Sequence, residues 1–205
     1  MNSCTINGKL FSLGRRGLKV TDKGSIYGSI NILIDEKTNT TVEVNFMPQS
    51  PTYKSGNENT TYELLNTILK TQPSVEKLGL KDAMMLRCDG DITTNPYFAA
   101  EKGKKSDGLK LSEPSQIRGS FLHEDDRVLP GANFTVVAWV KSMAAMDNDP
   151  DGGYRVNAEL YDDYNGFYRP VSFVIRDALG ISSLNNHIVD QPYVTTLSGI
   201  LAEYS

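Results

Sequence analysis

The sequence predicts a mainly β protein built from two tandem Greek-key barrels, the second shorter than the first, with one helix in the first. Three observations predict this fold class. Apolar and polar residues alternate along most of the chain, which is the period of half-buried strands. A single segment has helical spacing, and it follows the third expected strand. Four short segments of the first half recur, in the same order, in the second half.

Three strands are expected before the helix, at residues 6–12, 26–34 and 42–46, where apolar side chains recur at every second position. The buried face of the first strand is expected to hold Ile6, Gly8, Leu10 and Ser12. Residues 14–17 read Gly-Arg-Arg-Gly, and this sequence is expected to end the first strand.

The helix is expected to start at Thr60, because Thr60 and Glu63 fit a capping box, and to end before Pro73. Its apolar face is expected to hold Tyr62, Leu65, Ile68 and Leu69. Two further strands are expected at 85–92 and 116–122, with a polar loop at 99–114 between them. Three strands, a helix and two strands is the order of the OB-fold, a five-stranded barrel. A β-sandwich is the alternative, which the capped helix at this place disfavours.

A second copy is expected after Pro130-Gly131. Residues 5–13 and 135–143 share the pattern Thr, branched apolar, any, small, any, apolar, any, Ser, apolar. The other matches pair 30–32 with 156–158, 42–46 with 171–175 and 88–92 with 197–201, and residues 177–188 stand in the place of the helix. Chance matching of short alternating segments is the alternative. We predict an OB-like nucleic-acid-binding barrel at 1–126 and a second OB-like barrel at 131–205 that serves protein contact or dimerisation.

Composition and motifs exclude several classes of function. No run approaches the roughly 18 apolar residues of a membrane span. Cys4 and Cys88 are too few for a disulfide framework and are expected to be buried thiols in a reducing cytoplasm. No nucleophile elbow or phosphate-binding loop occurs, and neither His123 nor His187 has metal-ligand spacing. We therefore expect no enzyme, no cofactor and no metal centre.

One segment matches the first half of a calcium loop. Residues 147–152 read Asp-Asn-Asp-Pro-Asp-Gly, but the twelfth position of the loop is Ala158 instead of a bidentate glutamate. A polar hairpin is the preferred interpretation, and cation binding by Asp147, Asp149 and Asp151 is left open.

Positive charge is concentrated in the first half. The net charge is −4, but residues 1–126 hold 16 basic and 16 acidic residues and are neutral. Two loops carry clusters of basic residues: the loop between the first two strands, with Lys9, Arg15, Arg16, Lys19 and Lys23, and the loop between the last two, with Lys102, Lys104, Lys105 and Lys110. In an OB-fold these loops flank the face that binds oligonucleotides and oligosaccharides. We expect the two clusters to form one positive rim.

Aromatic residues supply the second requirement of a single-strand binder. Stacking on a flat side chain contributes about 1–3 kcal/mol per base. Tyr27, Tyr97 and Phe98 lie at expected strand ends or loops and are predicted to stack on bases, whereas Phe46 is predicted to be core. The aromatic residues around Asp162 and Asp163 suit a protein contact better, and they are Tyr161, Tyr164, Phe167 and Tyr168.

The order of elements, the sequence Gly90-Asp91-Ile92 followed by Asn95-Pro96-Tyr97-Phe98, and the paired basic loops resemble phage-type single-stranded DNA-binding proteins with OB-folds. The resemblance covers residues 4–124 best. It implies a non-catalytic protein that coats single-stranded DNA during replication or recombination in the host cytoplasm. A homodimer or a replication-protein partner would use the second half.

The predicted function is therefore sequence-tolerant binding of single-stranded DNA. A structural β protein of a virion or tail is the alternative, since it would explain the acidic, tyrosine-rich second half without nucleic acid. A carbohydrate-binding module ranks lower, because the one tryptophan, Trp139, falls in an expected strand.

Overall fold

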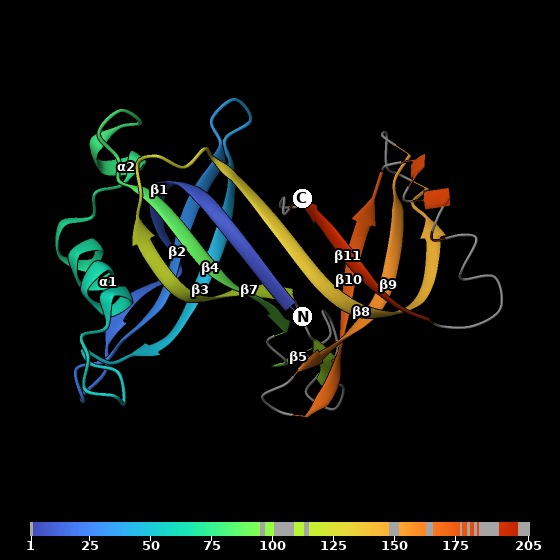
Figure 1. The fold of residues 1–205 in the computed structure, drawn as a ribbon, viewed down its shortest axis with the longest axis horizontal. Coiled ribbons are helices and arrows are strands. Elements are labelled where there is room, and N and C mark those ends of the chain that lie inside the picture. Colours follow the sequence, from blue (N-terminus) through green and yellow to red (C-terminus); the bar gives the residue numbers. More distant parts are fainter. Residues whose placement is uncertain are drawn as a thin grey trace. The chain divides into compact units, whose positions relative to one another are not determined.

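The computed structural model describes residues 2–94, 97–100, 109–112, 115–147, 152–162, 166–176, 178–179, 181–182, 184 and 193–200. The chain is mainly β (Figure 1) and divides into two compact units. We call residues 3–92, 116–135 and 198–205 the barrel unit, and residues 1–2, 93–115 and 136–197 the sheet unit. Within the described ranges, no helix is both long and apolar enough to cross a membrane.

Five strands close the barrel unit. They are β1 (Asn2–Val20), β2 (Ile26–Asp35), β3 (Thr40–Gln49), β4 (Met85–Thr94) and β7 (Ser115–Glu124). The pairs β1–β2, β2–β3 and β1–β4 are antiparallel, and β3 pairs with β7 in parallel. Since β7 also neighbours β4, the order β1-β2-β3-β7-β4 returns to β1. The helices α1 (Thr60–Thr71) and α2 (Val75–Leu78) lie between β3 and β4 in the chain, so the predicted order of strands and helix is confirmed.

The barrel is filled by the apolar side chains that alternate along its strands. Ile6, Leu10, Ile30, Ile32 and Val44 have no exposed area, and Phe46 is buried as predicted. Burial of an aliphatic side chain of this size stabilises the fold by about 1.5–3 kcal/mol. The alternation therefore fixes which face of each strand points inward.

β1 contains a bulge that the sequence pattern did not predict. Leu10 lies opposite Ile32 and Ser12 lies opposite Asn31, so Phe11 is an extra residue in this strand. Directly opposed residues point to the same side of a sheet. Ser12 therefore points to the side of Asn31, where it is buried and where its Oγ accepts a hydrogen bond of 3.0 Å from Asn31 Nδ2. Ser12 is thus buried like Ile6, Gly8 and Leu10, as predicted, but the bulge places it beside Asn31.

A second, larger irregularity follows in the same strand. Leu13 lies opposite Ile30 and Leu18 lies opposite Gly28. The four residues 14–17 of β1 therefore span the place of one residue, Ser29, on β2. The prediction that residues 14–17 end the first strand was wrong, because β1 bulges there and continues to Val20. Its long, curved path lets β1 pair with both β2 and β4.

The helix α1 begins one residue away from the predicted cap. Asn59 is extended and its side chain accepts a hydrogen bond of 3.3 Å from Tyr62 N, whereas Thr60 is already helical. Leu65 and Ile68 are buried as predicted. The hydroxyl of the fully buried Thr61 accepts a hydrogen bond of 3.1 Å from Leu122 N of β7. This bond attaches the first turn of α1 to β7 of the barrel.

The sheet unit holds the remaining strands. Its antiparallel sheet has the order β10-β9-β8, with β11 also paired to β8. Their bounds are β8 (Gly131–Ala145), β9 (Tyr154–Asp162), β10 (Phe167–Ile175) and β11 (Tyr193–Ile200). β5 (Tyr97–Ala100) and β6 (Leu109–Ser112) form a separate hairpin in the segment that was expected to be a polar loop. Described residues 178–179, 181–182 and 184 are helical. No fifth strand closes the sheet among the described residues, so the predicted second barrel is present only as this sheet.

The first two strands of the sheet unit repeat the register of β1 and β2. Val140 lies opposite Ala158 and Ser142 lies opposite Asn157, which makes Lys141 an extra residue. Asn157 Nδ2 donates a hydrogen bond of 3.1 Å to Ser142 Oγ. The bulge in β1 has the same spacing and the same Asn–Ser bond.

The third strand follows the same register. Val42 lies opposite Ile32 in the barrel unit, and Val171 lies opposite Ala158 in the sheet unit. The matches 30–32 with 156–158 and 42–46 with 171–175 therefore have the same pairing in both units. A duplicated three-stranded meander accounts for this agreement better than chance does.

Both thiols are free and buried, as predicted. Burial, together with the charges of Asp91 and Asp89, raises the pKa of Cys4 to about 12, and burial also raises the pKa of Cys88. At neutral pH the reactive thiolate form of both residues is suppressed.

We expect the variant Thr61→Val to lose about 1–3 kcal/mol of unfolding free energy. Valine keeps the shape of threonine but leaves the buried amide of Leu122 without its acceptor. The matched control is Thr67→Val, where an exposed hydroxyl donates only to the carbonyl of Glu63 in the same helix. Urea unfolding measures both. Equal losses in the two variants would show that the bond to Leu122 does not fix α1.

Candidate nucleic-acid interface

Residues 14–17 are held against the outer face of β2 and β3 by hydrogen bonds to the backbone. Arg15 N donates to Glu43 Oε1 over 2.9 Å, and Arg16 N donates to Ser29 Oγ over 3.3 Å. Ser29 Oγ in turn donates to Glu43 Oε1 over 2.6 Å. One carboxylate and one hydroxyl thus hold two consecutive amides, and we call this group the Glu43 anchor.

Gly14 is required for this arrangement. A Cβ at position 14 would lie 2.3 Å from Ser29 Oγ and 2.7 Å from Glu43 Oε1, well inside contact distance. Ser29 is fully buried beneath the bulge. The backbone of the bulge therefore packs directly on the anchor, and only glycine permits this approach.

The side chains of the bulge point into solvent. Arg15 and Arg16 are both exposed, and within the described part of the chain no carboxylate forms an ion pair with either guanidinium. Because the Glu43 anchor uses their amides, both cationic groups stay available. The sequence predicted these arginines in the loop between the first two strands, and the structure corrects this position to a bulge within β1.

The rest of the first cluster lies further along the same hairpin. Lys19 is exposed and lies directly opposite Tyr27, whose side chain is 37% exposed. Lys23 lies in the tight turn between β1 and β2, which is closed by a hydrogen bond from Gly24 N to Thr21 O. The set formed by Arg15, Arg16, Lys19, Lys23 and Tyr27 is called the hairpin face below.

Lys9 does not join the hairpin face. It lies opposite Leu33, further along β1 from the turn. Its amino group donates to the carbonyl oxygen of Leu80 and lies 3.7 Å from Glu36 Oε1. This lysine thus ties β1 to the segment after α2.

The second basic cluster falls largely outside the described residues. Lys102, Lys104 and Lys105 are not described, and for Tyr97, Phe98 and Lys110 only the backbone is placed. Tyr97 and Phe98 begin β5, and Lys110 of β6 pairs with Ala99. The expected meeting of the two basic loops therefore stays a prediction.

Acidic residues on β4 are already paired. Arg118 donates to both carboxylate oxygens of Asp91, over 2.9 and 2.5 Å. Partial burial raises the pKa of Asp89, but hydrogen bonds from the Thr5 hydroxyl and from Arg87 outweigh it, so this pKa lies below its ordinary value. Asp89 is therefore ionised at neutral pH, and its side of the barrel is less suited to a polyanion than the hairpin face is.

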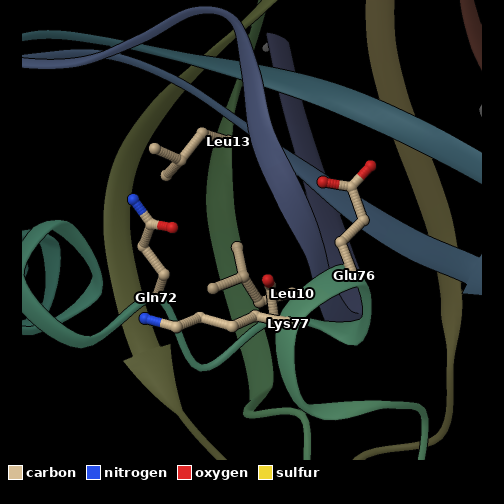
Figure 2. A pocket seen from close by; sticks show the side chains of 6 residues that line it. Leu10, Leu13, Gln72, Glu76 and Lys77 are labelled. Atoms are coloured by element: carbon tan, nitrogen blue, oxygen red, sulfur yellow. The ribbon is translucent and has the colours of Figure 1, made fainter.

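A pocket of about 540 Å³ lies between β1 and the segment that follows α1. Figure 2 shows Leu10 and Leu13 of β1 beside Gln72, with Lys77 extending toward Gln72 and Glu76 turned away. Lys77 Nζ donates to Thr71 O over 2.9 Å, which satisfies a carbonyl at the end of α1. Lys77 thus caps the C-terminal end of α1. Because its amino group is used in this way, we assign the pocket no ligand.

No cluster of metal-ligating residues occurs in the described ranges. Asp149 and Asp151 of the calcium-like loop lie outside these ranges. In the acidic segment after His123, the carboxylate of Asp125 accepts hydrogen bonds from both the amide and the guanidinium of Arg127.

Sequence reasoning missed Ser29 and Glu43, the two residues of the anchor. Both occupy polar positions of alternating strands, where a solvent-facing role is the usual one. A glycine followed by two arginines and another glycine was the one available signal of a bulge, and the pattern does not say which side chains would hold it.

Together the five-stranded closed barrel, the helix before its fourth strand and the cationic hairpin define an OB-fold protein with an exposed basic face. The chain belongs to the YorF family, whose model matches residues 2–204. No curated protein sequence matches the chain.

Solved structures agree with this fold. The wild-type single-stranded DNA binding protein from Thermus aquaticus is 12% identical, with a TM-score of 0.53, over 98% of this chain and 84% of that one. A deletion variant of the same protein gives 13% identity and a TM-score of 0.55, over 98% of this chain and 86% of that one. At this identity the likeness concerns the fold alone.

We expect Gly14→Ala to lower the unfolding free energy by about 1–3 kcal/mol, because the new methyl group must displace Ser29 or Glu43. The control is Gly17→Ala. Its φ is +59° and nothing lies within 4 Å, so the substitution costs roughly 1 kcal/mol of backbone strain and leaves the anchor intact. Urea unfolding compares the two. A Gly14 variant as stable as the wild type would mean that the bulge is not held as described.

Proposed function

We propose that the protein binds single-stranded DNA with little sequence preference and acts without catalysis in phage DNA replication or recombination. The single observation that carries this proposal is the hairpin face, where exposed cations and an exposed tyrosine lie on the outer surface of an OB barrel. OB-folds bind oligonucleotides on the face of the second and third strands and the adjoining loops.

Four of the five residues of the hairpin face have a defined role in this proposal. The guanidinium groups of Arg15 and Arg16 neutralise phosphates and release their counterions. Tyr27 offers its ring to a base, and Lys19 opposite it meets the neighbouring phosphate. Because the Glu43 anchor fixes the backbone under both arginines, less conformational entropy is lost on binding.

The second basic cluster is proposed to contribute further contacts. Tyr97 and Phe98 would stack on bases, and Lys102, Lys104, Lys105 and Lys110 would contact phosphates. The order β1-β2-β3-β7-β4 supports this arrangement, because the connection between β4 and β7 corresponds to the second binding loop of an OB-fold.

Residues 1–126 and 131–205 are proposed as two OB-like domains. Their shared register, bulge and Asn–Ser hydrogen bond support a common origin. The second domain provides a surface for a second copy or for a replication protein, in addition to the site argued in the next subsection.

The test is a titration of the full chain with fluorescein-labelled oligo-dT at several salt concentrations, read by anisotropy. Affinity should fall steeply with salt, because phosphate neutralisation releases counterions. In the double variant Arg15→Ala/Arg16→Ala, the slope of log K against log salt should be shallower by about 1.4, since each single-strand phosphate contact contributes roughly 0.7.

The charge-matched control is Lys37→Ala/Lys81→Ala, which removes two exposed lysines near the end of β2 that is opposite to the β1–β2 turn. It should bind like the wild type. Absence of binding at low salt, or equal weakening by the two double variants, would refute the proposed site.

A further inference from the structure

The geometry points to a second base-stacking site for single-stranded DNA, on the face of β8, β9 and β10 that carries Trp139, Tyr161 and Tyr168. This inference rests on the proposed function, but it concerns different residues in the sheet unit. The three residues are called the aromatic row below.

The aromatic row lies on the side of the sheet opposite its apolar face. Ala138, Val140, Leu160 and Val171 are buried, and the residues between them alternate to the other side. On that side Tyr161 lies directly opposite Tyr168, and Trp139 lies opposite Glu159. Tyr161 is 46% exposed and Tyr168 is 52% exposed. The two tyrosine rings therefore do not serve the core, and this inference assigns them a role other than the protein contact predicted for them from the sequence.

The three rings form a continuous series. The centroids of Trp139 and Tyr168 are 5.9 Å apart with an interplanar angle of 69°, and those of Tyr161 and Tyr168 are 5.3 Å apart at 59°. Such edge-to-face contacts hold the rings in place without stacking them face to face. The two tyrosine rings are flat, fixed and exposed, as a sequence-tolerant stacking site requires, whereas Trp139 is half-buried beside them.

A cation covers one face of the Trp139 ring, at the end of the aromatic row. Lys141 is the extra residue of the β8 bulge, and its Nζ lies 3.2 Å from the centroid of the Trp139 ring. The same amino group lies 3.2 Å from Glu159 Oε2, which fixes its position. A phosphate next to a base stacked on this row would lie within reach of this ammonium group.

Val137 and Pro170 also lie on this face, but the part of it around Asn157 is polar and carries a second cation. Ser172 Oγ donates to Asn157 Oδ1 over 3.0 Å, and Asn157 donates to Ser142, so a hydrogen-bonded chain crosses the three strands. Arg155 is exposed on the same side, because it alternates with the buried Val156 along β9 as Asn157 does. It lies opposite Ala144 and Val174. A face with aromatic rings, hydrogen-bonded polar groups and an arginine fits the bases and phosphates of a nucleic acid. An obligate protein interface would instead present a broad apolar surface.

Trp139 makes this site directly observable, because it is the one tryptophan of the chain. Titration of the full chain with oligo-dT should quench tryptophan fluorescence with the midpoint that anisotropy of the labelled oligonucleotide gives. Tyr161→Ala and Tyr168→Ala should each weaken binding about tenfold, within the range for loss of one stacked base. Their salt slope should match that of the wild type, because tyrosine carries no charge.

Two controls separate stacking from damage to the fold. Tyr168→Phe keeps the ring and should bind like the wild type. Tyr53→Ala removes a similarly exposed tyrosine from the barrel unit and should have no effect. Circular dichroism of each variant checks that the strands persist.

The outcomes distinguish this inference from the proposed function. If oligo-dT binds but tryptophan emission does not change and both tyrosine variants bind like the wild type, the aromatic row is not a site, while the hairpin face stands. If the tyrosine variants instead lower the mass in sedimentation without loss of binding, the face joins copies of the chain and the inference is overturned. If no oligonucleotide binds at low salt, both proposals fail.

Discussion

The placement of the hairpin face depends on the carboxylate of Glu43. It accepts hydrogen bonds from the amide of Arg15 and the hydroxyl of Ser29, which in turn accepts from the amide of Arg16. Without these acceptors the bulge would leave two amides unpaired beside a fully buried serine. The Glu43 anchor thus supplies hydrogen-bond acceptors to the backbone amides of Arg15 and Arg16. As a consequence, the two cationic side chains face outward.

In both units a bulge inserts one extra residue into the first strand of the meander. In β1 the extra residue is Phe11, and in β8 the extra residue is Lys141, which lies against the Trp139 ring. In each case an Asn–Ser hydrogen bond follows the bulge and fixes the register. The two three-stranded meanders therefore share the position of their bulge but differ in the side chain that the bulge carries.

Charge is arranged so that exposed cations and paired acids lie on different strands of the barrel. Arg87 and Arg118 are bound to the carboxylates of Asp89 and Asp91 on β4 and β7. On the hairpin, the described residues leave the guanidinium groups of Arg15 and Arg16 to solvent. The overall charge of −4 therefore says little about the potential over any one face.

Alternation in the sequence by itself determined the five barrel strands and most of the core, because a period of two fixes which side chains are buried. Helical spacing and capping residues determined the place of the helix. It also determined the internal repeat, since matching residues take matching registers. The tertiary structure decided where Ser12, Arg15 and Arg16 point, because a bulge depends on acceptors such as Glu43 that are distant in the chain. It also decided that Trp139, Tyr161 and Tyr168 meet on one face, since cross-strand register is set by pairing between segments and not by the order of residues within one.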